Sequence, residues 1–159
     1  MRVLFLLILG LLVQGCQYDP YAHLFTTKRP QEADLTGLYV LTEQTVSRGG
    51  LSALGGKPCS VEIRSDGTFT GTNIPPWASG EPATNFFGTL RSATGKWRIE
   101  GVGGVDDGSG KVETHWGIYL DSDTKLEPVG LASNKPPYSL IYTLGDPDAG
   151  QVLILTRIK

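Results

Sequence analysis

The sequence predicts an all-β protein, an antiparallel up-and-down barrel of about seven to eight strands. Short segments in which apolar and polar residues alternate recur from Leu35 onward, which is the period-two pattern of half-buried strands. Clusters of glycine, proline and aspartate separate these segments, and no long helical pattern interrupts them. A sandwich also suits this series, but consecutive hairpins that end in a long final pair favour a closed barrel, because closure removes exposed edges.

The first predicted strand is Thr36–Thr42. Its alternation places Leu38 and Val40 on one face and Tyr39 and Leu41 on the other. We expect a short helix or a coiled loop between this strand and the next.

A hairpin follows. Ser60–Arg64 alternates regularly, so that Val61 and Ile63 face inward. Ser65–Thr68 contains Asp-Gly, which readily adopts the positive φ angles of a type I′ turn, and Thr68–Thr72 is the expected return strand.

The middle of the chain combines a long apolar loop with a strand. The loop is Ile74–Gly88, and the strand is Thr94–Glu100, with Trp97 and Ile99 facing inward. The glycine-rich stretch Gly101–Gly110 is expected to form a turn.

A longer strand, Lys111–Leu120, is expected next, and its alternation leaves His115 on the solvent face. The opposite, inward face carries Val112, Thr114, Trp116, Ile118 and Leu120. An irregular connection, Asp121–Pro137, leads to a closing hairpin of Tyr138–Leu144 and Gln151–Ile158.

The N-terminus indicates export. Arg2 precedes Val3–Val13, an apolar run that is too short to span a bilayer, which needs about 20 residues. The junction Gly15-Cys16 resembles the bacterial lipoprotein signal, in which a peptidase cuts before a lipid-modified cysteine. That resemblance makes residues 1–15 a signal peptide and Cys16 the acylated residue (carrying palmitate or a similar chain). The alternative is an ordinary cleaved signal peptide with an accidental cysteine.

The resemblance places the protein in the bacterial cell envelope, and Gln17 favours the outer membrane if the source has two membranes.

Residues 16–34 are expected to be the lipidated cysteine and a flexible tether of about 18 residues, spanning roughly 20–25 Å. The aromatic residues of this segment could lie at the lipid interface, and the alternative is a loop partly packed on the domain. Residues 35–159 are then the barrel domain. The chain has 14 basic and 16 acidic residues and no basic run, which argues against nucleic acid as a partner. Cys59 is expected to be a small buried apolar residue.

Three stretches, Thr36–Val40, Ser65–Phe69 and Gly95–Trp97, are similar to motifs of small bacterial lipocalin-like barrel domains. The ending Leu144–Gly150 also resembles a recurring segment of uncharacterised bacterial secreted proteins. The resemblance implies an architecture and no ligand, because turn chemistry and core aromatics carry it.

No motif here predicts catalysis, a cofactor or a metal site. Asp146, Asp148 and Gly150 have the D-x-D-x-G spacing of a calcium loop, but Arg157 stands where an EF-hand needs glutamate, so a turn is expected. The two histidines lack the spacing of a zinc site. We therefore expect a non-catalytic protein.

The aromatic residues suggest the remaining candidate site, a barrel cavity with an apolar mouth that binds a small hydrophobic ligand or lipid. Its candidate residues are Trp77, Phe86, Phe87, Trp97 and Trp116. The alternative is a barrel plugged by the loop and filled by its own side chains, acting as an envelope protein–protein interaction module. The expected partners are the membrane, through the N-terminal lipid, and this apolar ligand; the sequence does not determine the oligomeric state.

Overall fold

The computed structural model describes residues 19–45, 57–75, 90–106, 110–124, 126, 128–143, 146 and 149–158. The expected signal peptide, Cys16 and Gln17 lie outside these residues. So does most of the connection after the first strand.

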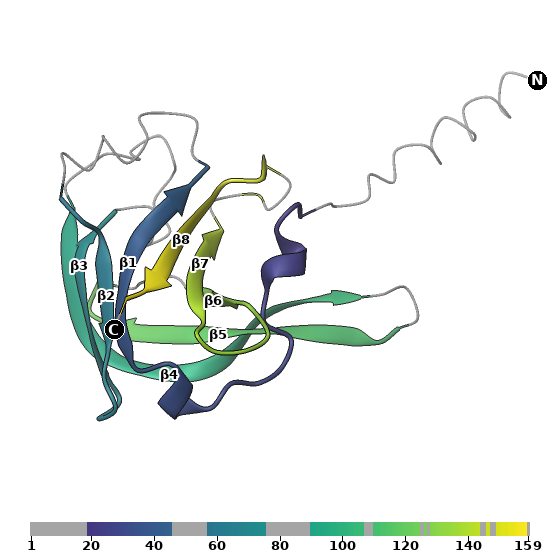
Figure 1. The fold of residues 1–159 in the computed structure, drawn as a ribbon, viewed down its shortest axis with the longest axis horizontal. Helices are drawn as coiled ribbons and strands as arrows, with labels where there is room; N and C mark the ends of the chain where they lie inside the picture. The colour runs from purple at the N-terminus through teal and green to yellow at the C-terminus, as the bar shows by residue number, and fades with distance from the viewer. Residues whose placement is uncertain are drawn as a thin grey trace, which may run out of the picture.

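Within the described residues, eight strands form a closed antiparallel barrel in chain order (Figure 1). The predicted up-and-down barrel is thereby confirmed and the sandwich is not. The strands are β1 Gly37–Gln44, β2 Ser60–Ile63, β3 Thr68–Ile74, β4 Arg91–Asp106, β5 Val112–Ser122, β6 Val129–Ala132, β7 Ser139–Thr143 and β8 Val152–Arg157. β8 pairs with β1 to close the ring.

The inner face follows the predicted alternation on the first strands. Val61 and Ile63 are buried on β2, and Tyr39 is fully buried on β1 with Leu41 packed against the same core. On β4, Trp97 is buried and Ile99 packs against the core from the same face. The period-two pattern therefore identified the core side of β2 and β4 correctly, and on β1, where it separated two faces without choosing between them, the inner face is that of Tyr39 and Leu41.

The β2–β3 hairpin has a different turn from the one predicted. Arg64 N donates to Thr68 O at 2.9 Å and Gly67 N donates to Arg64 O at 3.2 Å, which makes a three-residue loop. Gly67 has a φ of +80°, whereas Asp66 is not among the described non-glycine residues with positive φ. A type I′ turn needs positive φ at both central residues, so that prediction was wrong.

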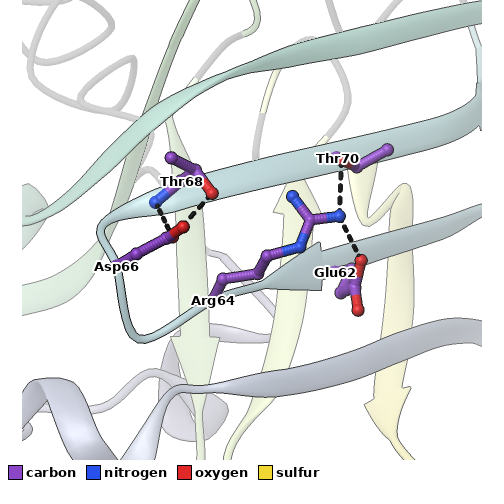
Figure 2. Close-up of polar contacts among 5 residues, drawn as sticks. All are labelled: Glu62, Arg64, Asp66, Thr68 and Thr70. Carbon is purple, nitrogen blue, oxygen red and sulfur yellow. Dashed lines mark hydrogen bonds and ion pairs between the residues drawn. The ribbon is translucent and has the colours of Figure 1, made fainter.

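The Asp66 carboxylate explains this choice of turn. It accepts hydrogen bonds from Thr68 N at 2.9 Å and from Thr68 Oγ1 at 2.6 Å, as Figure 2 shows. These bonds hold the pKa of Asp66 below its ordinary value and fix the aspartate before the glycine. On the same hairpin, Arg64 donates to Thr70 Oγ1 at 2.9 Å and pairs with Glu62 (Figure 2).

β4 and β5 form a hairpin much longer than predicted. Their pairing runs from Gly95 opposite Ser122 to Asp106 opposite Val112, with a bulge between Gly101 and Gly103. The expected turn at Gly101–Gly110 was therefore wrong over residues 101–106, which belong to β4. Gly104 allows β4 and β5 to approach each other closely here. A Cβ on Gly104 would stand 2.8 Å from Val112 Cγ1 and 2.9 Å from Glu113 O.

One end of the barrel is covered by the chain that precedes β1. The short 3₁₀ helix η2, Glu32–Asp34, leads into Leu35, whose carbonyl accepts a hydrogen bond from Tyr39 Oη at 2.8 Å. Arg157 Nη1 donates to Asp34 O at 2.9 Å, which ties the end of β8 to the same segment. We call this the closed end.

The segment expected to be a free tether lies against the barrel from residue 19 onward. It begins with a 3₁₀ helix, η1, Ala22–Leu24, and Thr26 follows as a buried residue between two strands. Thr26 N donates to Leu131 O on β6, and Trp116 N on β5 donates to Thr26 O, both at 2.8 Å. The tether prediction is thus corrected for residues 19–34.

The physical reason is the short pairing of β5 with β6, which is limited to Gly117 opposite Gly130 and Ile118 opposite Val129. Beyond it, both strands have backbone groups that need partners, and the N-terminal segment supplies them. No helix among the described residues is long and apolar enough to cross a bilayer.

Candidate functional site

The five predicted ligand-binding residues do not form one group in the described part of the chain. Trp77, Phe86 and Phe87 lie outside it. Trp97 is buried at the closed end, where its Nε1 donates to Arg64 O at 2.9 Å. Trp97 stands six residues along β4 from Arg91, or about 20 Å from the end where the connection between β3 and β4 begins.

Trp116 lies past the barrel rather than inside it. It continues the inner face of β5, but it precedes Gly117, the first residue that β6 pairs with. It is half-buried, and the Arg29 guanidinium lies 5.2 Å from the centroid of its ring. The predicted face was right and the predicted core position was wrong, because alternation does not show where a barrel ends.

Inside the barrel, the described inner face is filled by the protein's own side chains. Eleven members of this core are each less than 2% exposed: Tyr39, Phe69, Leu35, Ile63, Ile74, Ile118, Leu120, Leu131, Leu140, Leu155 and Val61. A ligand among them would have to displace close-packed groups. This packing favours the filled form of the barrel that the sequence left open.

Outside the barrel, β4 and β5 continue together as a two-stranded ribbon, which projects to the side in Figure 1. We define the ribbon as residues 101–106 and 112–116. Val105 and Val112 near its far end are 45% and 61% exposed. Val105 stands opposite Glu113 and Val112 opposite Asp106, so the two valines lie on opposite faces.

The ribbon has an open backbone edge. β3 pairs with β4 only as far as Thr68 opposite Lys96, and Trp97 N then donates to Gly67 O. From residue 98 to residue 106, β4 has no strand on that side in the part of the chain that the structure describes. Such an edge offers N–H and C=O groups to another chain.

At the root of the ribbon, His115 is buried against the N-terminal segment, contrary to the predicted solvent position. Its ring is stacked on Phe25 with the centroids 4.8 Å apart, and only 9% of the residue is exposed. Burial lowers the pKa of His115, while the charges of Asp19 and Glu113 oppose that shift. Sequence patterns could not predict this contact, since Phe25 is 90 residues away from His115.

The groups that the ribbon offers to a neighbour are backbone groups and apolar side chains. No three His, Cys, Asp or Glu side chains among them are placed to hold a metal ion. Cys59 is buried, as predicted, and burial raises the pKa of its thiol to about 12, which makes it a poor nucleophile. What the site presents is a backbone edge, two exposed valines and a root at which His115 is buried against Phe25. The sequence signal for it was the valines placed among the glycines of residues 101–105, which we interpreted as a turn.

Comparison of the chain with protein-family models, curated proteins and solved structures gave no match.

Proposed function

We propose that this protein is a non-catalytic, lipid-anchored lipoprotein of the bacterial envelope, in which a filled barrel presents the β4–β5 ribbon to a protein partner. The open edge of β4 from residue 98 to residue 106 carries this proposal. A two-stranded ribbon is marginally stable alone, and here the barrel and the N-terminal segment hold its root. The ribbon is therefore available for addition of a strand from another protein.

The anchor is supported by the junction Gly15-Cys16, which follows a short apolar run. A cysteine that carries two or three acyl chains anchors stably, because each buried methylene contributes about 0.8 kcal/mol. The outer membrane is the destination that Gln17 favours in a bacterium with two membranes.

The carrier function suggested by the aromatic residues is less well supported. Trp97 and Trp116 both lie toward the closed end or beyond it, and the described inner face is filled. A small apolar ligand would need a separate cavity at the opposite end of the barrel.

In-cell photo-crosslinking from the ribbon tests the proposal. A photoreactive phenylalanine analogue replaces Val105 or Val112, and a matched control replaces Thr94, which is exposed on the same strand β4 but beside β3. We expect the analogue at either ribbon position to give one adduct of the same defined mass. The yield of this adduct from position 94 should be at least fivefold lower. The adduct should disappear when Val105→Lys is combined with the analogue at position 112.

Equal adducts at all three positions, or none at the ribbon, would overturn the proposed interaction surface. Native mass spectrometry of the same protein checks the carrier function, since a co-purifying small molecule would favour that function instead. Intact mass measures acylation of Cys16, and Cys16→Ser should move the protein to the soluble fraction.

A further inference from the structure

The first described residue, Asp19, already belongs to the fold. Its carbonyl accepts a hydrogen bond from Ala22 N at 3.1 Å, and its Oδ1 accepts one from Tyr21 N at 2.8 Å. Pro20 lies against the connection between β7 and β8, where a Cβ on Gly150 would stand 3.1 Å from Pro20 Cγ. Asp19 therefore belongs to the folded turn that leads into η1, and Pro20, next to it, is in contact with the barrel.

This position leaves little chain for an anchor. Three Cα–Cα steps separate Cys16 from Asp19, and they cannot extend beyond about 11 Å in any conformation. A lipid on Cys16 would hold that residue at the membrane surface, so Asp19 would stand within about 11 Å of it. The barrel cannot then move away from the membrane as it would on a tether of about 18 residues.

The N-terminal segment then runs along the side of the barrel from one end to the other. It begins beside the β7–β8 connection at Gly150 and reaches the β6–β7 turn at the opposite end, where Thr27 N donates to Asn134 Oδ1 at 2.8 Å. Tyr21, Leu24 and Phe25 pack on the outer surface of the barrel in a second apolar cluster. We call residues 19–30 and 133–137 together the anchor wall.

The anchor wall is basic. Asp19 is its one acidic residue, since the sequence has no other aspartate or glutamate from position 20 to position 31 or from 133 to 137. Lys28, Arg29 and Lys135 are all exposed, and the hydrogen bond from Thr27 to Asn134 brings their two segments together. Lysine and arginine near a membrane attract anionic headgroups, so this cluster, at the opposite end of the barrel from Asp19, supplies a second contact besides the lipid.

We propose, on the premise that Cys16 is lipidated, that the anchor wall rests on the anionic phospholipid headgroups of the bilayer that holds the lipid. The barrel then lies on its side, and neither of its ends faces the membrane. The ribbon projects from the same side as the N-terminal segment in Figure 1. A partner that binds the ribbon consequently does so close to the membrane surface.

Fluorescence quenching in proteoliposomes tests this orientation on the full lipidated chain. Because Cys16 is consumed by acylation and Cys59 is buried, an introduced cysteine is the reactive thiol for a fluorophore. Lys135→Cys places the fluorophore on the anchor wall. Lys96→Cys is the matched control, since Lys96 is an exposed lysine on β4, across the ring from β7 and β8.

With vesicles of phosphatidylcholine and phosphatidylglycerol that contain a headgroup spin label, we expect at least threefold stronger quenching at position 135 than at position 96. The double variant Lys28→Glu/Arg29→Glu should reduce the quenching at position 135 at least twofold, whereas Lys57→Glu should not. Thermal melting of each variant verifies that it is folded.

The two proposals fail separately. Equal quenching at positions 135 and 96 on protein whose acyl mass is confirmed would overturn the orientation alone. A mass that shows Cys16 without acyl chains would overturn the anchor and this inference with it.

Discussion

The imidazole ring of His115 lies parallel to the phenyl ring of Phe25, with an interplanar angle of 2° and 4.8 Å between the centroids. His115 stands at the root of the ribbon, and Phe25 belongs to the segment that leads from the proposed anchor. The stack therefore joins the two features on which the proposals depend. It lies beside Thr26, whose backbone bonds to both β5 and β6.

Phe25→Ala should destabilise the protein by about 3 kcal/mol, the usual cost of removing a large buried aromatic side chain. The loss combines the stack on His115 with the packing of the ring over Gly130, where a Cβ would stand only 2.4 Å from Phe25 Cε1. Urea unfolding followed by tryptophan fluorescence measures it. Lys28→Ala, an exposed position on the same segment, should change stability by less than about 0.5 kcal/mol.

Hydrogen exchange sharpens that prediction. The amides of Thr26 and Trp116, which bond across the segment, should lose protection in Phe25→Ala before those of β2 and β3. If Phe25→Ala lowers stability no more than Lys28→Ala does, the segment is not an integral part of the fold. The argument that Asp19 holds the barrel within about 11 Å of a lipidated Cys16 would then lose its basis.

Acidification should weaken the protein through His115. Burial lowers the pKa of His115 below its ordinary 6.5, so the unfolded chain binds a proton more readily than the folded one. This contribution is complete above pH 6.5 and is lost as the pH falls from 6.5 toward the folded pKa. His115→Phe keeps an aromatic ring beside Phe25 and removes the titration, so the free energy of unfolding should vary less between pH 7 and pH 5. Identical pH profiles for the variant and the wild type would contradict this account.

The predictable part of this fold was its local part. Alternation in β2 and the first half of β4 predicted both the strands and their inner faces, and in β1 it predicted the strand and its two faces, because period-two patterning follows burial on one side. The 3₁₀ segments, the place of Phe25 and the burial of His115 could not be predicted, since they arise from contacts far apart in sequence. The prediction of a turn at Gly101–Gly104 was wrong for a different reason. Composition alone does not distinguish glycine that turns a chain from glycine that lets two strands come close.

Gly95 supplies a matched test of that distinction within β4. A Cβ there would stand 1.9 Å from Asp121 O and 3.1 Å from the Phe69 ring, so Gly95→Ala must separate β4 from β5. We expect a loss of about 3 kcal/mol, as for other overpacked sites. Gly103→Ala, on the same strand, meets no atom within 4 Å and should stay within about 0.5 kcal/mol of the wild type. Thermal melts of the two variants measure the contrast, and equal losses would refute the close approach of β4 and β5.

Cys59 reports on whether the barrel is filled. It is 2% exposed, and burial raises the pKa of its thiol to about 12 from 9.0. In Cys16→Ser it is the only cysteine of the chain, so every labelled thiol is Cys59. We expect alkylation by iodoacetamide at pH 8 to be at least 100-fold slower than in the urea-unfolded chain, because only opened molecules react.

The contribution of Cys59 to stability depends on pH with a defined sign, and a second variant, Cys59→Ala, tests it. A folded pKa above the unfolded value stabilises the protein below pH 9, and the contribution is lost as the pH rises from 9 toward 12. Cys59→Ala should remove that part of the alkaline loss while the part due to Tyr39, whose pKa burial also raises to about 12, remains. Labelling in native buffer at the rate of the unfolded chain would mean that a small molecule reaches the core. That result would contradict the filled barrel and favour the alternative, a hollow barrel that binds a ligand.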